Sequence, residues 1–389
     1  MARRLLPLAV LMGGLLAGCS TLESITPSFD SLNPFASKGP KMAELTPIQA
    51  TAELRQDWNY QIGKAGNAVF YPAVAGNAVF VAAADGSIAK LEGGQAVWRI
   101  NAGKPLSAGV GSDGVTVVVG TGTGEVLAFS ARDGSPLWQA RVSSEVLAPP
   151  LVEGDMIVVR SGDNRVVALD AQGKRKWLYQ RPTPTLSLRS TAPMMIADRF
   201  VLTGFPGGKL VALALHNGAP VWEGTVALPK GATELDRVAD VVAQPAAGGP
   251  LGCAVAYQGR VTCFDFSQGG NTVWSRDISS AAGLTLDSRS VYVTDDSSAI
   301  QALSLDSGGS LWKQDKLFMR RVTAPMTAGR NYLAVGDAQG VVHLLNRDDG
   351  AFAARFTTDG SPINSAPQRL GNQILVQTRS GNVYALDVQ

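Results

Sequence analysis

The sequence predicts an all-β fold, an eight-bladed β-propeller with four-stranded antiparallel blades. First, seven tryptophans recur at intervals of 40, 40, 39, 45, 52 and 38 residues, and a period near forty is typical of a repeat architecture. Second, every tryptophan after the first follows a glycine by four positions. Third, 43 glycines and only 17% charged residues suit many short strands joined by tight turns. The tryptophans are Trp58, Trp98, Trp138, Trp177, Trp222, Trp274 and Trp312.

The N-terminus predicts a secretory signal at residues 1–18. Arg3 and Arg4 precede an apolar run, Leu5–Leu16, that is too short to span a bilayer. The segment Leu16-Ala17-Gly18-Cys19 resembles a bacterial lipobox, which implies cleavage before Cys19, a thioether lipid on its sulfur and acylation of its amine by palmitate. Ser20 after the cysteine resembles lipoproteins sorted to the outer membrane, facing the periplasm. The alternative is an ordinary secretory signal with an incidental cysteine.

Residues 19–55 predict a lipidated flexible tether. Serine, threonine, proline and lysine are common there, and apolar residues show no sustained period. A flexible segment of this length has a mean reach on the order of 30 Å. The alternative is a short helix or a partner-binding peptide anchored by Pro34-Phe35.

Residues 56–389 predict the propeller. In the first repeat, four apolar runs within 70–100 are separated by Gly76-Asn77, Asp85-Gly86 and Gly93-Gly94, which are hairpin turns. Further blades are predicted at about 106–143, 146–181, 189–227, 238–278, 281–314 and 322–357.

The seventh repeat predicts how the ring closes. It has Ala354 where the other repeats have tryptophan, with Phe352 and Phe356 as candidate replacements. After it, 363–388 supply only three strands, whereas 57–62 carry Trp58 with no blade before them. Pairing the N-terminal strand with the C-terminal strands gives eight blades and removes exposed sheet edges.

Two cysteines, Cys253 and Cys263, flank a predicted hairpin. A three-residue loop ending at Gly259 places them directly opposite each other, whereas a two-residue loop points them to opposite faces. Because the periplasm is oxidising, we expect a disulfide that acts as a local staple with no redox role.

No catalytic, cofactor-binding or metal-binding residue is predicted. His216 and His343 do not have ligand spacing, and there is no Cys-x-x-Cys, nucleophile elbow or phosphate-binding loop. The paired aspartates at 295–296 and 348–349 are expected to cap turns rather than bind calcium. The formal charge of +2 and the lack of a basic stripe argue against nucleic acid as a partner.

The blade motif resembles that of pyrroloquinoline-quinone (PQQ)-dependent dehydrogenases. Those enzymes need calcium, a catalytic aspartate and typically two adjacent cysteines, and this sequence has no adjacent pair. An enzyme of this class is therefore the alternative function, and a cell-wall- or sugar-binding propeller is a third.

The lipobox, polar tether and eight blades together resemble the BamB family of outer-membrane protein assembly lipoproteins. This resemblance implies no cofactor and a non-enzymatic scaffold role in the β-barrel assembly (BAM) complex. The scaffold would dock on the periplasmic POTRA domains of the central barrel subunit. It would hold those domains in place or present unfolded outer-membrane proteins.

Two segments, 185–189 and 233–242, strengthen this resemblance. It implies partner-binding roles for Leu186, Leu188, Arg189 and Asp240. The second acidic residue of the family is Val242 here, and Asp236 is expected to contribute instead.

The tryptophan spacing points independently to the same region. The two longest intervals place extra residues at 182–189 and 228–240, in neighbouring links on one face of the ring. Long loops often carry function, and leucine anchors with an arginine that pairs with a carboxylate suit a protein partner. In the alternative interpretation, both leucines fill the ring's own core and Arg189 pairs internally with Asp236 or Asp240.

Overall fold

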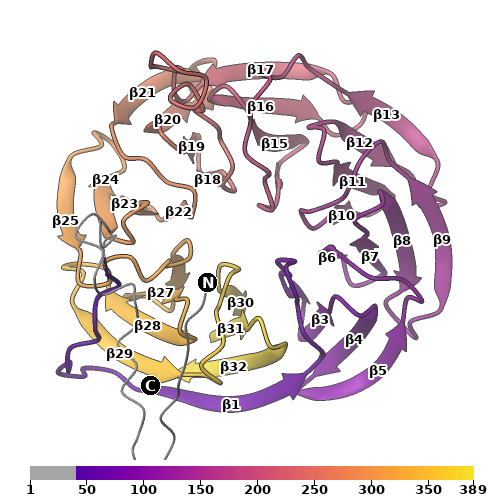
Figure 1. Ribbon diagram of the computed structural model, residues 1–389, viewed down its shortest axis with the longest axis horizontal. Coiled ribbons are helices and arrows are strands. Elements are labelled where there is room, and N and C mark those ends of the chain that lie inside the picture. Colours follow the sequence, from indigo (N-terminus) through magenta and orange to yellow (C-terminus); the bar gives the residue numbers. More distant parts are fainter. Residues whose placement is uncertain (1–40) are drawn as a thin grey trace, which may run out of the picture. The chain divides into compact units, whose positions relative to one another are not determined.

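Short apolar runs between glycine turns form eight four-stranded antiparallel sheets arranged around one axis (Figure 1). The computed structural model describes residues 41–389, and the all-β propeller with eight blades confirms the predicted fold class. The predicted signal peptide, Cys19 and residues 19–40 of the predicted tether lie outside the described residues.

Each blade has a short first strand at the centre of the ring and a fourth strand at its outer edge. Blades 1 to 4 contain β2 (Ala73–Ala75), β3 (Ala78–Ala82), β4 (Ser87–Glu92), β5 (Gln95–Asn101); β6 (Ala108–Ser112), β7 (Thr116–Gly120), β8 (Glu125–Ser130), β9 (Pro136–Arg141); β10 (Leu151–Glu153), β11 (Met156–Arg160), β12 (Val166–Leu169), β13 (Arg175–Tyr179); and β14 (Met195–Ala197), β15 (Phe200–Phe205), β16 (Lys209–Ala214), β17 (Pro220–Thr225).

The second half of the ring repeats this order and ends with the seam where the chain closes. Blades 5 to 8 contain β18 (Ala246–Gly248), β19 (Leu251–Val255), β20 (Val261–Asp265), the 3₁₀ turn η2 (Phe266–Gln268), β21 (Asn271–Arg276); β22 (Gly283–Leu286), β23 (Ser290–Thr294), β24 (Ile300–Ser304), β25 (Ser310–Gln314); β26 (Met326–Ala328), β27 (Tyr332–Gly336), β28 (Val341–Asn346), β29 (Phe352–Thr357); and β30 (Gln368–Leu370), β31 (Gln373–Gln377), β32 (Asn382–Val388), β1 (Leu54–Gln61).

The ring closes through the two ends of the chain, as predicted. Strand β1 pairs antiparallel with β32, from Leu54 opposite Val388 to Gln61 opposite Asn382, and becomes the outer strand of blade 8. Closure gives blade 8 the outer strand that the C-terminal repeat lacks.

The antiparallel order gives the ring two different faces. The links between blades and the turns between second and third strands emerge on one face, which we call the connector face. The turns that join first to second and third to fourth strands emerge on the opposite face, which we call the turn face.

Each tryptophan locks its blade to the next one. Trp274 on β21 donates its indole N–H to the carbonyl of Leu305 in blade 6, at 2.6 Å. A Cβ on Gly308, in the same turn, would lie 2.5 Å from the indole carbon Cε3, so only glycine leaves room for the ring. The same pairing joins Trp58 to Gly94, Trp98 to Gly134, Trp138 to Gly173, Trp177 to Gly218, Trp222 to Gly270 and Trp312 to Gly350. The glycine before one tryptophan therefore accommodates the tryptophan of the preceding blade.

Blade 7 has no tryptophan on its fourth strand, and its boundary with blade 8 lacks the tryptophan–glycine contact found between the other blades. Ala354 pairs with Leu344, the register that tryptophan has in the other blades. The neighbouring blade 8 has no turn between its third and fourth strands, because these strands come from opposite ends of the chain. In place of the turn, the backbones of Glu53 and Gln389 form two hydrogen bonds of 2.9 and 3.0 Å. Phe356 instead packs edge-on against Tyr384 of blade 8, with ring centroids 6.0 Å apart.

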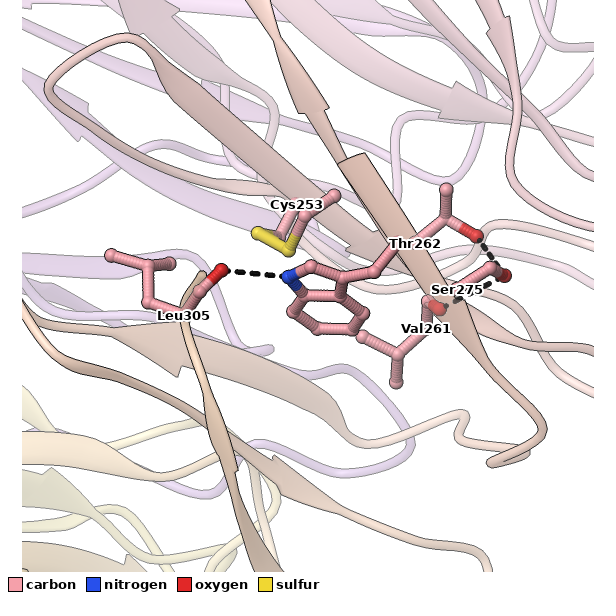
Figure 2. Close-up of a disulfide and its surroundings, with 7 residues drawn as sticks. Cys253, Val261, Thr262, Ser275 and Leu305 are labelled. Carbon is pink, nitrogen blue, oxygen red and sulfur yellow. Dashed lines mark hydrogen bonds between the residues drawn. A yellow bond between two sulfur atoms is a disulfide. The ribbon is translucent and has the colours of Figure 1, made fainter. Parts of the chain in front are cut away.

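A disulfide joins Cys253 on β19 to Cys263 on β20. The two residues lie directly opposite in the antiparallel register, with Cα atoms 4.1 Å apart, and both are fully buried. Figure 2 shows the disulfide beside the hydrogen bond to Leu305, within the packing between blades 5 and 6.

The residues before β1 differ from a free tether. The amide of Ala43 donates to the carbonyl of Phe318, and that of Thr51 donates to the carbonyl of Ala353, both at 2.9 Å. Over residues 43–53, the chain therefore lies against the propeller.

Candidate partner-binding surface

The two longest links between blades lie side by side on the connector face. The link from β13 to β14 covers 180–194, and the link from β17 to β18 covers 226–245. Both flank blade 4 and contain all the residues that the sequence predicts as partner-binding. The structure therefore brings those residues to one region of the connector face, on two neighbouring links.

Leu186, Leu188 and Arg189 lie on the first of these links with different degrees of exposure. Leu186 is 40% exposed, Leu188 is half-buried, and the Arg189 side chain is 70% exposed. The leucines therefore do not both fill the core of the ring.

Arg189 is paired within the chain, with a residue that the sequence did not indicate. Its Nη2 lies 2.6 Å from Oε1 of Glu145, which belongs to the link between blades 2 and 3. Hydrogen bonds from Ser144 and from Arg189 hold the pKa of Glu145 below its ordinary value, so this carboxylate is charged near neutral pH. The ion pair orients an exposed guanidinium that still has further N–H groups to offer.

Asp240 is buried and connects the two long links. Its side chain is 1% exposed; Oδ2 accepts the Leu188 amide at 2.7 Å and Oδ1 accepts the Gly207 amide at 3.0 Å. Burial lowers the pKa of the nearby Arg160 to about 10, and the negative charge of Asp240 opposes that shift. A buried carboxylate that accepts two backbone amides holds a loop in place.

Val242 reinforces the same contact through its backbone. It is buried, and its carbonyl accepts a hydrogen bond from the hydroxyl of Ser190 at 3.0 Å. At this position the chain therefore presents a buried apolar side chain rather than an acidic surface group.

Asp236 lies at the exposed tip of the second long link. Its carboxylate accepts hydrogen bonds from the hydroxyl and the amide of Thr233, at 2.7 and 3.1 Å, and these bonds lower its pKa. Two leucines on the same link, Leu228 and Leu235, are 65% and 69% exposed. Sequence reasoning missed them because isolated leucines in a loop look like core residues, although their position in the longest link was a usable signal.

The centre of the ring contains a cavity of about 600 Å³, lined mainly by the links that lead into blades 4 to 8 and by the first strands of those blades. Asp295 at its edge accepts the amides of Ser297 and Ala299, at 3.0 and 2.9 Å, as a turn cap does. Within residues 41–389, no group of three or more His, Cys, Asp or Glu side chains is arranged to hold a metal ion. In the same range, no helix is long and apolar enough to cross a membrane.

Comparisons with known proteins agree on one family. A family model described as outer membrane protein assembly factor BamB matches residues 88–314 and 298–389. The chain is 44% identical to the outer membrane protein assembly factor BamB of Bordetella pertussis, over 96% of this chain and 95% of that protein. It is 29% identical to the protein of the same name from Escherichia coli, over 99% of both chains.

Solved structures give the same result. The crystal structure of BamB from Moraxella catarrhalis superposes with a TM-score of 0.80 and 29% identity, over 86% of this chain and all of that one. The quinohemoprotein alcohol dehydrogenase of Comamonas testosteroni gives a TM-score of 0.67 at 13% identity, over 86% of this chain and 76% of that enzyme, which is a likeness of fold alone.

Proposed function

The chain belongs to the BamB family of outer-membrane protein assembly factors, and from this premise we propose that it is a non-enzymatic scaffold of the β-barrel assembly complex. Its connector face docks on the periplasmic POTRA domains of the central barrel subunit and supports folding and insertion of outer-membrane proteins. A lipid on Cys19 holds it at the outer membrane, facing the periplasm. Unfolded outer-membrane proteins are the second class of partner that this scaffold would contact.

One observation carries the proposal: Asp240 fastens the two longest links to each other and leaves apolar side chains exposed on both. Leu186 on one link and Leu228 and Leu235 on the other are each at least 40% exposed. Exposed leucines on a braced loop are suited to bury against a partner, because little conformational freedom is lost on binding.

The polar half of the surface comes from the Arg189–Glu145 pair. Glu145 accepts a hydrogen bond from Nη2 of Arg189, so the remaining N–H groups of the guanidinium are available to a partner carboxylate. Because Asp240 is buried, its contribution to binding is to position Leu188. Glu145, Glu234 and Asp236 are acidic groups that a partner would meet.

The test is copurification of the central barrel subunit with the double variant Leu186→Ala/Arg189→Ala. Removing an apolar anchor and a charged anchor at an interface typically costs 2 kcal/mol or more, which weakens binding by about 30-fold. We therefore expect the partner to be lost at dilute concentration while the circular dichroism spectrum stays unchanged.

The matched control is Leu137→Ala/Arg132→Ala, which removes the same side chains from blade 2. Leu137 is 50% exposed and the Arg132 side chain is 89% exposed, and neither lies on the long links. If both double variants copurify with the partner equally well, the surface is wrongly assigned. Dye reduction by the same preparation, supplied with quinone and calcium, would instead identify a dehydrogenase.

A further inference from the structure

Residues 43–53 form a strap that crosses the outside of blade 7 from one face of the ring to the other. At the connector face, the Ala43 amide donates to Phe318 in the link between blades 6 and 7. At the turn face, the amides of Thr51 and Ala52 both donate to the carbonyl of Ala353 near the start of β29, at 2.9 and 3.2 Å. Figure 1 shows the strap in indigo beside β25 and β29.

Apolar packing holds the middle of the strap. Leu45 and Ile48 are half-buried and pack against the cluster between blades 6 and 7 that contains Leu317 and Phe352. Their neighbours along the strap are exposed, so the segment is docked by one side only. This pattern is that of an extended chain laid on a surface.

A buried arginine fastens the first residue of the strap. Arg320 is 2% exposed, and its Nε lies 2.7 Å from Oδ2 of the buried Asp337. Its Nη2 donates to Gln339 at 2.8 Å, and its Nη1 donates to the carbonyl of Ala43 at 3.0 Å. Undocking the strap would remove an acceptor from a buried cation, which is strongly unfavourable.

A second arginine fastens the strap further along. Nη1 of Arg355 on β29 donates to the carbonyl of Thr46 at 2.5 Å. The two guanidinium groups bond backbone carbonyls, so they add to the apolar packing two contacts that do not depend on the side chains of the strap.

The strap changes the face on which the chain leaves the propeller. Strand β1 begins at Leu54, opposite Val388 at the end of β32, and this point lies on the turn face. Without the strap, the N-terminal segment would leave from there. With it, the segment leaves beside Phe318 on the connector face, two blades away from the link that contains Asp240.

We propose that the strap biases the orientation of the propeller, because it makes the chain leave at Ala43, on the same face as the partner-binding surface. This inference rests on the proposed function for the anchor at Cys19 and for the docking surface. A lipidated tether that starts from Ala43 favours orientations in which the connector face is turned toward the membrane, so the strap favours a partner that is itself held at this membrane. Periplasmic domains of a membrane-embedded subunit are such a partner.

Hydrogen exchange tests whether the strap is docked as described. In the variant Leu45→Ser/Ile48→Ser, we expect protection of the Ala43 and Thr51 amides to fall about tenfold or more. Protection within β1, which pairs with β32, should stay. The control Val115→Ser changes a 72% exposed residue on the turn face and should leave both amides protected. Rapid exchange of the Ala43 amide in the unaltered protein would overturn the inference.

Orientation is tested with the lipidated full-length protein on phosphatidylethanolamine–phosphatidylglycerol vesicles that carry an acceptor dye on their headgroups. A donor dye is placed at Leu235→Cys on the connector face or at Val115→Cys on the turn face. We expect more energy transfer from position 235 than from 115, and a smaller difference once the strap is released by Leu45→Ser/Ile48→Ser. Equal transfer from both positions, or a difference that release leaves unchanged, would refute an orienting role.

Failure of the proposed function has a different signature. If Cys19 carries no lipid, the protein stays off the vesicles and neither position transfers energy, while the exchange experiment still decides whether the strap is docked. If the docking surface is misplaced, the Leu186→Ala/Arg189→Ala variant keeps its partner although the strap remains protected. Release of the strap should leave partner binding in free solution unchanged, because its residues are separate from both long links.

Discussion

The strongest test of the packing between blades is the substitution Gly308→Ala. Gly308 has a φ of +66°, and an alanine Cβ there would lie 2.5 Å from the indole of Trp274. The left-handed backbone costs a non-glycine residue about 1–2 kcal/mol. Forcing a methyl group into a filled site costs a further ~1–3 kcal/mol. The expected loss of unfolding free energy is therefore about 2–5 kcal/mol.

The control for this substitution is Gly76→Ala. Gly76 has nearly the same φ, +64°, but a Cβ there meets no atom within 4 Å. It should cost only the backbone penalty of about 1–2 kcal/mol. Guanidinium unfolding followed by far-ultraviolet circular dichroism measures both variants without relying on tryptophan fluorescence. The difference between them isolates the contact with the indole.

A double-mutant cycle decides whether the indole is the cause. Trp274→Ala alone should cost about 3–5 kcal/mol, because the side chain is buried and loses its hydrogen bond to Leu305. In that background, Gly308→Ala should cost no more than Gly76→Ala, giving a coupling of about 1–3 kcal/mol. If the full Gly308→Ala penalty persists without the indole, or never exceeds that of Gly76→Ala, the lock between blades is not what requires glycine.

Three further predictions concern other sites. Asp240→Asn removes an oxygen acceptor, so it should speed exchange of the Leu188 amide and weaken partner copurification, although Asp240 itself is buried. Burial lowers the pKa of His343, so the unfolded chain binds more protons below pH ~6.5 and stability falls as the pH is lowered from about 7 to 5. His343→Gln should flatten that fall in denaturant titrations. Reducing the disulfide between Cys253 and Cys263 should lower the unfolding free energy by about 2–3 kcal/mol, measured by denaturant unfolding with and without reductant.

The architecture could be predicted from the sequence because its information is local and repeated. Each tryptophan after the first, with the glycine four positions before it, marks a fourth strand and its turn, so the repeats could be counted directly. The closure followed from counting as well, since Trp58 had a strand without a blade and the C-terminus had a blade without a fourth strand.

The details of the candidate surface could not be predicted in the same way, because they depend on contacts between distant segments. Arg189 pairs with Glu145, 44 residues earlier, and the Leu188 amide bonds Asp240, 52 residues later. Both links are polar loops without a period, so nothing local distinguishes a buried carboxylate from an exposed one. The sequence suggested only Asp236 or Asp240 as internal partners of Arg189. It gave no sign that the link between blades 2 and 3, which contains Glu145, lies beside Arg189.

The strap escaped sequence reasoning for a related reason. Its apolar contacts with the boundary between blades 6 and 7 come from Leu45 and Ile48, too few to produce a period. Its other contacts are made by its backbone: carbonyls accept hydrogen bonds from Arg320 and Arg355, and amides donate to Phe318 and Ala353, so they place little demand on residue type. Segments held by their backbone leave little trace in the sequence.

The irregular seventh repeat and the strap are two consequences of the same seam. A tryptophan on β29 would need a glycine turn in blade 8, and that turn is replaced by the meeting of the two chain ends. The position is instead filled from the N-terminal side, where Leu54 is buried with Ala354, and Ala52 packs against the same cluster. The end of the strap therefore substitutes for the missing lock. A truncation that begins the chain at residue 54 should consequently loosen the boundary between blades 7 and 8, which loses Ala52, and the boundary between blades 6 and 7, which loses Leu45 and Ile48.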